Sequence, residues 1–311
     1  MRPRDVALAL LVVLLWGVNF AVIKVGLRGV SPFVLAGLRM VLTAFPAILL
    51  VERPRLPIRV FAGFALASFL MQFGLLFLAI KVGMPSGLAS VVQQSQVFFT
   101  VLLAAAVFGE RPRPMQLAGI VVAAVGLAII GAQSGTSPYA AAFWPSRLAT
   151  QAEPAPPPLA GFLLTLAAAS FWAIGNLVSR SLSRYGRVSG LAFVVWSALI
   201  PPVPFFLLAR IVEGPGTIAA SFRAMDAGSW AAVGYLAFGA TLGGYGLWNK
   251  LLKAYPAAQV ARFTLLVPVI GLACGAAFFG ESLSVAQLAG CALVALGLAL
   301  PIAAMWLTRL A

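Results

Sequence analysis

Uncharged polar and aromatic side chains stand inside long apolar stretches of this 311-residue chain, where they could bind a solute. A polar group in hydrocarbon is costly unless it faces protein or water, so its position indicates a solute pathway. Amides donate and accept hydrogen bonds, so several of them can hold the carboxylate and the ammonium of one zwitterion. The residues predicted to bind such a substrate are Trp16, Asn19, Gln72, Gln93, Gln94, Gln96, Trp172, Asn176, Tyr245, Trp248, Asn249, Gln259 and Arg262.

The spacing of these side chains places some of them on common helix faces. Trp172 and Asn176 are four residues apart, so they share one face of a helix. Gln93, Gln94 and Gln96 give their stretch the densest uncharged polarity in the chain. Two alternatives stay open: hydrogen bonds between helices for the glutamines, and plain packing for the tryptophans.

Residue types needed for other chemistry are missing from the middle of these stretches. The chain has no histidine, and its seven acidic residues avoid the centres of the stretches, which excludes a proton relay at that depth. This favours transport of the substrate down its gradient, or coupling through the substrate's own charge. Cys274 and Cys291 lack the spacing of a metal or redox motif. No catalytic residue, metal or cofactor is therefore predicted, and the chain is not expected to be an enzyme. The acidic residues are Asp5, Glu52, Glu110, Glu153, Glu213, Asp226 and Glu281.

The composition requires a bilayer. With 62% hydrophobic residues, 9% charged residues and a mean hydropathy of +1.04, the chain lacks the polar surface of a water-soluble protein. A helix needs about 20 apolar residues to cross the hydrocarbon, and the stretches lack the alternation of barrel strands. The predicted fold class is an all-α integral membrane protein with ten transmembrane helices. The stretches cover approximately 6–27, 32–51, 59–80, 85–108, 114–132, 158–178, 188–210, 229–250, 256–279 and 284–306.

The sequence repeats itself. The run Phe-Gly-Glu at 108–110 recurs at 279–281, an offset of 171 residues. In both copies Gln-Leu-Ala-Gly follows a few residues later. Each copy holds five stretches, and an odd number of spans forces the second copy to cross the membrane in the opposite direction. We therefore expect two inverted-topology five-helix repeats, residues 1–132 and 158–311, joined by an extracytoplasmic proline-rich linker at 133–157.

The basic residues set the expected orientation. With the N-terminus inside, thirteen Lys and Arg residues fall on the cytoplasmic side and six outside, so both termini are predicted to be cytoplasmic. The net charge of +14 is spread singly over helix ends, which suits contact with anionic lipid and not nucleic acid. Lys24 and Arg180 stand at span ends and are expected to reach the lipid headgroups.

Five further residues are predicted to be structural. Gly119 and Gly290 lie in stretches with small residues every four positions, which lets helices approach closely and could form the contact between the halves. Glu110 and Glu281 each follow a glycine at the end of a stretch, where a carboxylate is expected to bond to the N-terminus of the next helix. A buried proton carrier is the alternative for these two acids. Arg39 is within reach of the headgroups from its span.

The repeated unit resembles a known family. Two five-span copies, each closing with Phe-Gly-Glu, a short turn and Gln-Leu-Ala-Gly, are similar to the EamA-type permeases of the drug/metabolite transporter superfamily. The runs at 14–20 and 23–26 resemble those of bacterial exporters of amino acids and their precursors, such as cysteine and O-acetylserine or aromatic amino acids. Many members of the family carry a proline early in the fourth span. This chain has such a proline in the ninth span, Pro268, but the aligned residue of its fourth span is Val97.

The resemblance implies an exporter of amino acids and related small metabolites in the bacterial cytoplasmic (inner) membrane, with broad specificity for neutral, aromatic or thiol amino acids. Alternating access is expected from the inverted halves, and uniport from the missing midplane acids. A drug or lipophilic-metabolite exporter and a channel-like facilitator stay open as alternatives. The expected partners are the substrate and the lipid bilayer, and two halves in one chain allow a monomer to form the whole pathway.

Overall fold

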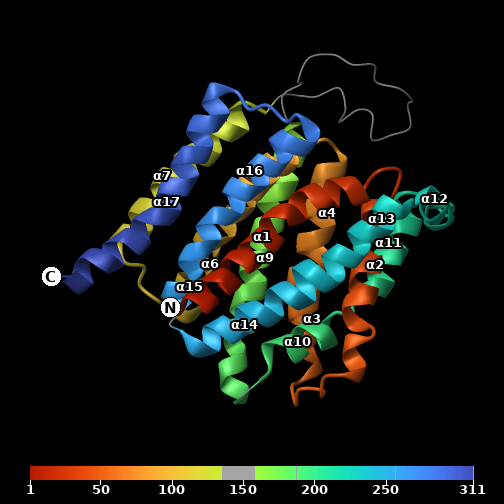
Figure 1. The fold of residues 1–311 in the computed structure, drawn as a ribbon, viewed down its shortest axis with the longest axis horizontal. Helices are drawn as coiled ribbons and strands as arrows, with labels where there is room; N and C mark the ends of the chain where they lie inside the picture. Colours follow the sequence, from red (N-terminus) through yellow and green to blue (C-terminus); the bar gives the residue numbers. More distant parts are fainter. Residues whose placement is uncertain (135–157, 187, 256, 311) are drawn as a thin grey trace.

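The structure, a computed structural model, describes residues 1–134, 158–186, 188–255 and 257–310, which form a bundle of helices (Figure 1). No strand occurs within these ranges. The predicted linker at 133–157 lies outside the described residues except for Gln133 and Ser134. The prediction of an all-helical membrane fold is confirmed.

The first half contains α1 (Pro3–Gly26), α2 (Pro32–Ala44), η1 (Ala47–Leu49), α3 (Ile58–Phe64), η2 (Ala65–Met71), α4 (Gln72–Lys81), α5 (Ser86–Val92), η3 (Gln93–Ser95), α6 (Gln96–Phe108) and α7 (Pro114–Ala132). The second half contains α9 (Leu159–Ser181), η4 (Leu182–Tyr185), α10 (Gly190–Ser197), α11 (Pro202–Val212), α12 (Thr217–Ala224), α13 (Ala227–Gly234), η5 (Tyr235–Gly243), α14 (Gly244–Ala254), α15 (Ala257–Ala261), η6 (Arg262–Leu265), α16 (Leu266–Phe279) and α17 (Val285–Leu310).

Nine helices in the described part of the chain are long and apolar enough to cross a membrane, against the ten predicted. The tenth prediction, at 229–250, corresponds to α13, η5 and α14, which follow one another without a gap. Glycines and amphipathic or polar side chains such as Tyr245, Trp248 and Asn249 lower the hydropathy of this segment. The segment is therefore less apolar than the other nine.

The ends of the helices explain the repeated Phe-Gly-Glu run. Gly109 ends α6 and Gly280 ends α16, with φ of 68° and 62° respectively. A residue with a Cβ is strained in this left-handed conformation, so glycine is needed to stop each helix at that point. The following glutamate is thereby turned away from the axis of its own helix.

Two pairs of irregular segments interrupt corresponding spans of the two halves. The π-helical segments are η2 in the third span and η5 in its counterpart, which begins about 170 residues later. The 3₁₀ segments are η3 and η6, in the fourth span and its counterpart. Pro268 contributes to the second break, because it has no N–H with which to make the α-helical bond to the carbonyl of Thr264. Such breaks recur at functional sites of membrane proteins.

The two halves meet directly where α7 and α17 lie side by side along one edge of the bundle (Figure 1). A Cβ added to Gly119 would lie 2.4 Å from the carbonyl oxygen of Gly297, and one added to Gly290 would lie 2.8 Å from that of Gly126. The helices therefore touch through their backbones at these glycines, in the manner of small-residue contacts between membrane helices.

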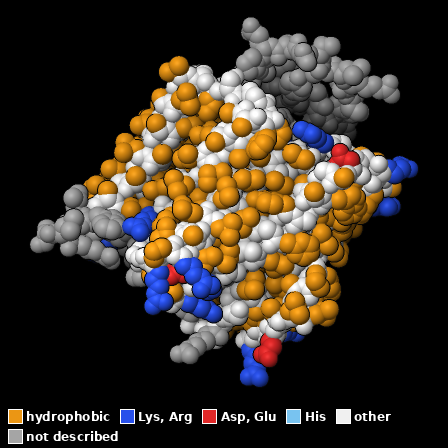
Figure 2. All heavy atoms as spheres, in the orientation of Figure 1, with side chains coloured by type: hydrophobic (Ala, Val, Ile, Leu, Met, Phe, Trp, Pro, Cys, Tyr) orange, Lys and Arg blue, Asp and Glu red, His pale blue; other side chains and the backbone are white. Residues whose placement is uncertain are grey.

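The remaining helices pack around an aromatic core. The rings of Phe64 and Phe193 are 4.7 Å apart, and Phe69 stacks on Phe73 at 5.7 Å. Helices α4 and α6 pack on α9, and α1 packs on α16. Figure 2 shows an apolar face across the middle of these helices with Lys and Arg gathered toward its ends, as expected of a surface covered by lipid.

The bundle has two ends, which we name by their acidic residues. At the Glu281 end Lys81 Nζ donates to the carbonyls of Leu27 and Val30, at 2.9 and 3.0 Å. Helix α9 begins at this end, since Gly161 lies against Met84. The 23 residues of α9 carry the chain about 34 Å to the Glu110 end.

Candidate functional site

Three of the predicted site residues form an aromatic cluster between α1 and α14. The rings of Trp16 and Tyr245 are 5.8 Å apart, and those of Trp16 and Trp248 are 5.1 Å apart. Trp16 Nε1 donates to the carbonyl of Ala240 in η5 at 3.1 Å. The bulge in η5 thus offers this carbonyl to a side chain of another helix.

Arg39 is buried beside this cluster and does not reach the surface, contrary to the expectation from its position in the span. Its side chain is 3% exposed, and Nε and Nη2 donate to Thr241 Oγ1 at 3.2 and 3.1 Å. Its Cζ lies 3.9 Å from the ring centre of Phe73, and Tyr245 is close enough to interact with its charge. The guanidinium therefore lies between Phe73, which comes just after η2, and Thr241, which lies within η5.

Several predicted amides bond between helices. Gln94 Nε2 donates to the carbonyl of Thr264 at 3.1 Å. This is the carbonyl that receives no backbone hydrogen bond from Pro268, because proline has no N–H. Asn176 Nδ2 donates to Gln96 Oε1 at 2.8 Å and to Thr100 Oγ1 at 3.1 Å. For these amides the interhelical bonding that the sequence left as an alternative is observed: Gln94 links the two broken spans, and Asn176 links α9 to α6.

Other buried polar atoms have no partner. A buried polar atom without a hydrogen bond costs about 1–3 kcal/mol and is uncommon in native proteins. Three of the residues concerned, Asn19, Gln72 and Gln93, were predicted to bind substrate. The atoms in the described residues are Asn19 Oδ1, Arg39 Nη1, Gln72 Oε1, both amide atoms of Gln93, Ser95 Oγ and Ser197 Oγ.

The other predicted site residues lie in α9, α14, α15 and η6. Trp172 and Gln259 are half-buried, and Asn249 lies against Gly190, where α10 begins. Arg262 Cζ lies 5.2 Å from the ring centre of Phe263.

Glu281 bonds to a helix of the other half and not to the next helix along the chain, which corrects the sequence prediction. Its carboxylate accepts hydrogen bonds from Lys24 Nζ at 2.6 Å and from the N–H groups of Ser86 and Gly87, both at 2.8 Å. Burial would raise the pKa of the Glu281 carboxyl, but these hydrogen bonds and the charge of Lys24 outweigh it and hold the pKa below its usual range. The Gln287 side chain caps the N-terminus of its own helix, α17, because its Oε1 accepts a hydrogen bond from the N–H of Ser284 at 3.0 Å.

Glu110 makes the corresponding ion pair at the opposite end. It accepts two hydrogen bonds from the guanidinium of Arg180, one of them from Nη1 to Oε2 at 2.9 Å. The hydrogen bond from Arg180 lowers the pKa of the Glu110 carboxyl. Lys24 and Arg180 therefore pair with acids, whereas the sequence predicted contact with lipid headgroups. The residue types were visible in the sequence, but their partners were not.

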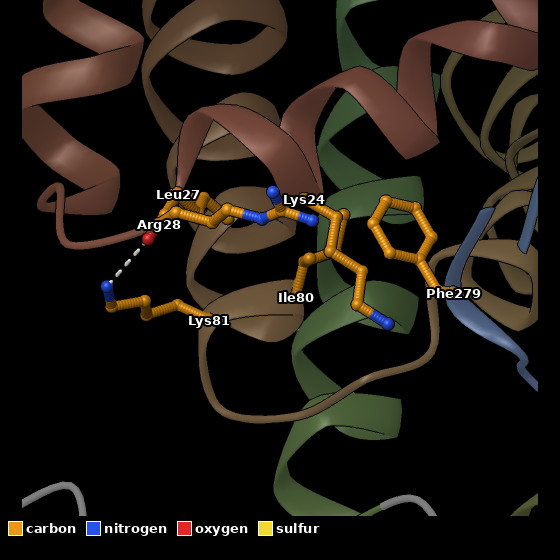
Figure 3. A pocket seen from close by; sticks show the side chains of 6 residues that line it. All are labelled: Lys24, Leu27, Arg28, Ile80, Lys81 and Phe279. Atoms are coloured by element: carbon orange, nitrogen blue, oxygen red, sulfur yellow. Dashed lines mark hydrogen bonds between the residues drawn. The ribbon is translucent and has the colours of Figure 1, made fainter. Parts of the chain in front are cut away.

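A cavity of about 380 Å³ opens beside Lys24 at the Glu281 end (Figure 3). Three of its six lining residues are cationic, and none is acidic. Figure 3 shows the ammonium of Lys81 turned toward the carbonyl of Leu27 and the ring of Phe279 beside Lys24. The lining residues are Lys24, Leu27, Arg28, Ile80, Lys81 and Phe279.

Comparison with known proteins shows the family of this chain. The model of the EamA-like transporter family matches residues 4–132 and 159–302, which is most of the chain. The chain belongs to this family. It is a multi-pass protein of the bacterial inner membrane and a member of a transporter family, not of an enzyme family.

Two similar proteins carry the same descriptive name, "Probable amino-acid metabolite efflux pump". One, from Salmonella typhimurium, is 45% identical over 299 residues, covering 96% of this chain and 94% of the relative. The other, from Escherichia coli K12, is 43% identical with the same coverage. A crystal structure of a protein 22% identical covers 100% of this chain and 99% of its own, with a TM-score of 0.62, and shares the fold.

Proposed function

We propose that this chain exports amino acids and related small metabolites across the cytoplasmic membrane. The names of the relatives at 43–45% identity support this substrate class. The half-buried aromatic and amide groups around Trp16 also suit small zwitterions with varied side chains, so we propose broad specificity. Transport proceeds by alternating access and as uniport, since no acid of the described spans lies at their centres to relay a proton.

The topology we propose has ten transmembrane helices in two inverted five-helix repeats, 1–132 and 158–311, with both termini in the cytoplasm. The segment α13–η5–α14 is the tenth span, because its 28 residues from Ala227 to Ala254 would reach about 42 Å as a helix. Breaks at matching positions of the two halves support the duplication. The basic residues at the Glu110 end support its placement on the cytoplasmic side.

The observation that carries the substrate site is the set of unpartnered buried atoms. Asn19, Arg39, Gln72 and Gln93 lie seven to nine residues from the Glu281 end of their helices. At 1.5 Å per residue this is about 11–14 Å, near the middle of a bilayer about 30 Å thick. Broken helices at that depth are where transporters bind their substrates.

Arg39 gives this site its charge preference. Its Nη1 has no partner, and within the described residues no acidic side chain bonds to its guanidinium. A buried cation without a counter-ion is costly, so an anion that binds there is favoured. We assign the substrate carboxylate to Arg39 and the ammonium to the amide oxygens of Asn19, Gln72 and Gln93. Arg39, first interpreted as structural, thereby becomes a binding residue.

Efflux from proteoliposomes tests this proposal. Vesicles loaded with a panel of labelled amino acids, and with the corresponding amines that lack the carboxylate, are compared for the parent, Arg39→Lys and Arg39→Gln. A lost charge-assisted hydrogen bond costs about 1.5–3 kcal/mol, so Arg39→Gln should slow amino acid efflux about tenfold or more. Arg39→Lys keeps the charge and should retain part of the rate, while the amines should lose no rate in either variant.

Amide substitutions extend the same assay. Gln94→Ala and Asn176→Ala should slow efflux, whereas Gln133→Ala, an exposed glutamine at the end of α7, should leave it unchanged. Equal rates in the parent, Arg39→Gln and Gln94→Ala for every amino acid would remove these residues from the site. Efflux that began only after a pH gradient was imposed would contradict uniport.

A further inference from the structure

The ion pairs Lys24–Glu281 and Arg180–Glu110 have the same construction. Lys24 corresponds to Arg180 at the offset of 156 residues, and Glu110 corresponds to Glu281 at the offset of 171. Each pair takes its base from the first span of one half and its acid from the turn after the fourth span of the other half. The base also lies near a ring of the neighbouring span, 4.5 Å from the centre of Phe279 for Lys24 and 5.1 Å from that of Phe108 for Arg180.

The two pairs lie at opposite ends of the bundle. Helix α9 begins beside Met84, close to the Lys24 pair, and carries Arg180 near its other terminus. The separation along α9 is about 30 Å, the thickness of the hydrocarbon core. One pair therefore stands at each mouth of the pathway that the proposed function requires.

The pairs differ in how tightly they close. The side chain of Glu281 is 10% exposed and that of Lys24 34%, and Glu281 is held further by the backbone of Ser86 and Gly87. The side chains of Glu110 and Arg180 are 43% and 56% exposed, and their bonds are to each other. The Glu281 pair is thus the more buried and the more firmly held of the two, although a cavity opens beside Lys24, while the Glu110 pair stays in contact with solvent.

We propose that the two ion pairs are alternating gates, and that this structure has the Glu281 gate closed and the Glu110 gate loosely joined. The proposal rests on the alternating-access function above. In the other state the Lys24–Glu281 pair parts, releasing the N–H groups of Ser86 and Gly87, and the Arg180–Glu110 pair becomes buried. Because each gate links the two halves, a movement of one half against the other opens one mouth as it tightens the other.

Accessibility of a buried position beneath the Glu281 gate tests this without knowledge of the substrate. Ser90 is 0% exposed and its Oγ bonds to the carbonyl of Gly87 at 2.6 Å. In a background where Cys274 and Cys291 are alanine, Ser90→Cys is treated from the Glu281 side with a membrane-impermeant thiol reagent. The parent should react slowly, and Lys24→Met should raise the labelling rate about tenfold or more, the order of one partly buried charged pair.

Matched variants separate gating from general loosening. Lys24→Arg preserves the pair and should keep Ser90→Cys protected. Arg28→Met, four residues after Lys24 and just beyond the end of α1, lines the same cavity; it removes a charge outside the gate and should also leave Ser90→Cys protected. Arg180→Met weakens the state in which the other end is closed, so Ser90→Cys should remain protected while efflux slows. Equal labelling in Lys24→Met and Arg28→Met would overturn the proposal.

Cross-linking provides the second measurement. Joining Lys24→Cys to Glu281→Cys with a short bifunctional thiol reagent, in the same cysteine-free background, should stop the efflux that the unlinked double variant still shows. Each single variant should export at the same rate with and without the reagent. Efflux at the unlinked rate after complete cross-linking would refute the gate. If Ser90→Cys labelling follows the Lys24 variants but no amino acid is exported, the gates stand and the proposed substrate class is wrong.

Discussion

Two glycine-to-alanine substitutions of identical chemistry should have opposite effects on stability. Gly119, in α7, faces the backbone of α17: an added Cβ would lie 2.4 Å from the carbonyl oxygen of Gly297 and 3.4 Å from Pro301 Cδ. An ordinary carbon-to-oxygen contact is about 3.3–3.6 Å, so the two helices would have to separate by about 1 Å. Gly234, at the end of α13, has helical dihedral angles and nothing within 4 Å of its added Cβ.

The magnitudes follow from this geometry. Overpacking costs about 1–3 kcal/mol, and the better helix propensity of alanine returns about 0.5–1 kcal/mol. Gly119→Ala should therefore destabilise the protein by up to about 2.5 kcal/mol. Gly234→Ala makes no new contact and should stabilise it by about 0.5–1 kcal/mol.

Thermal unfolding in detergent micelles measures the difference. The midpoint should fall for Gly119→Ala and rise for Gly234→Ala, and the double variant should lie near the sum because the sites share no partners. If Gly119→Ala raised the midpoint as much as Gly234→Ala does, the backbone contact between α7 and α17 would not be as close as described.

Two further results are expected. Gln94→Ala removes the donor to the carbonyl of Thr264 and should lower the free energy of unfolding by about 1 kcal/mol. In a Pro268→Ala background a backbone N–H is restored toward that carbonyl, so Gln94→Ala should cost less there. Additive effects of the two substitutions in a double-mutant cycle would argue against this coupling. The pKa of Glu281 lies below its usual value in the folded protein, so its contribution to stability is complete above the ordinary glutamate pKa and is lost as the pH falls through the folded value. The unfolding midpoint of the parent should drop in that acidic range, and a Glu281→Gln variant with the same drop would show that another group is responsible.

The sequence predicted features that depend on composition and local spacing. The apolar stretches located the spans, and small residues near Gly119 and Gly290 pointed to the helices that touch. Gln93, Gln94 and Gln96 were expected to need partners because amides are costly in hydrocarbon, but the 3₁₀ break at Gln93–Ser95 was not predicted. The 229–250 stretch was predicted from its apolar length like the others, although its glycines and amphipathic rings leave it less apolar than the nine candidate spans.

The sequence could not predict which distant residues meet. Lys24 and Glu281 are 257 positions apart, and nothing in their neighbourhoods distinguishes a base that pairs with an acid from one that reaches a headgroup. Arg39 was misjudged for a related reason: its distance from the span end allows contact with lipid, and only the packing of Phe73 and Thr241 around it shows that it stays inside. The π-helical segments leave no shared compositional signal, since η2 contains no glycine and η5 contains two.

The crossed origin of the two ion pairs bears on how such a chain could have arisen. A protein made of one half alone would carry one base and one acid that cannot reach each other, since they would stand at opposite faces of the lipid. Two such subunits, inserted antiparallel and related by a two-fold axis, would pair the base of each with the acid of the other, so the same ion pair would form twice. Gene fusion would then free the copies to differ, giving a lysine on one side and an arginine on the other. Descendants of the unfused ancestor should accordingly be obligate dimers that insert in both orientations.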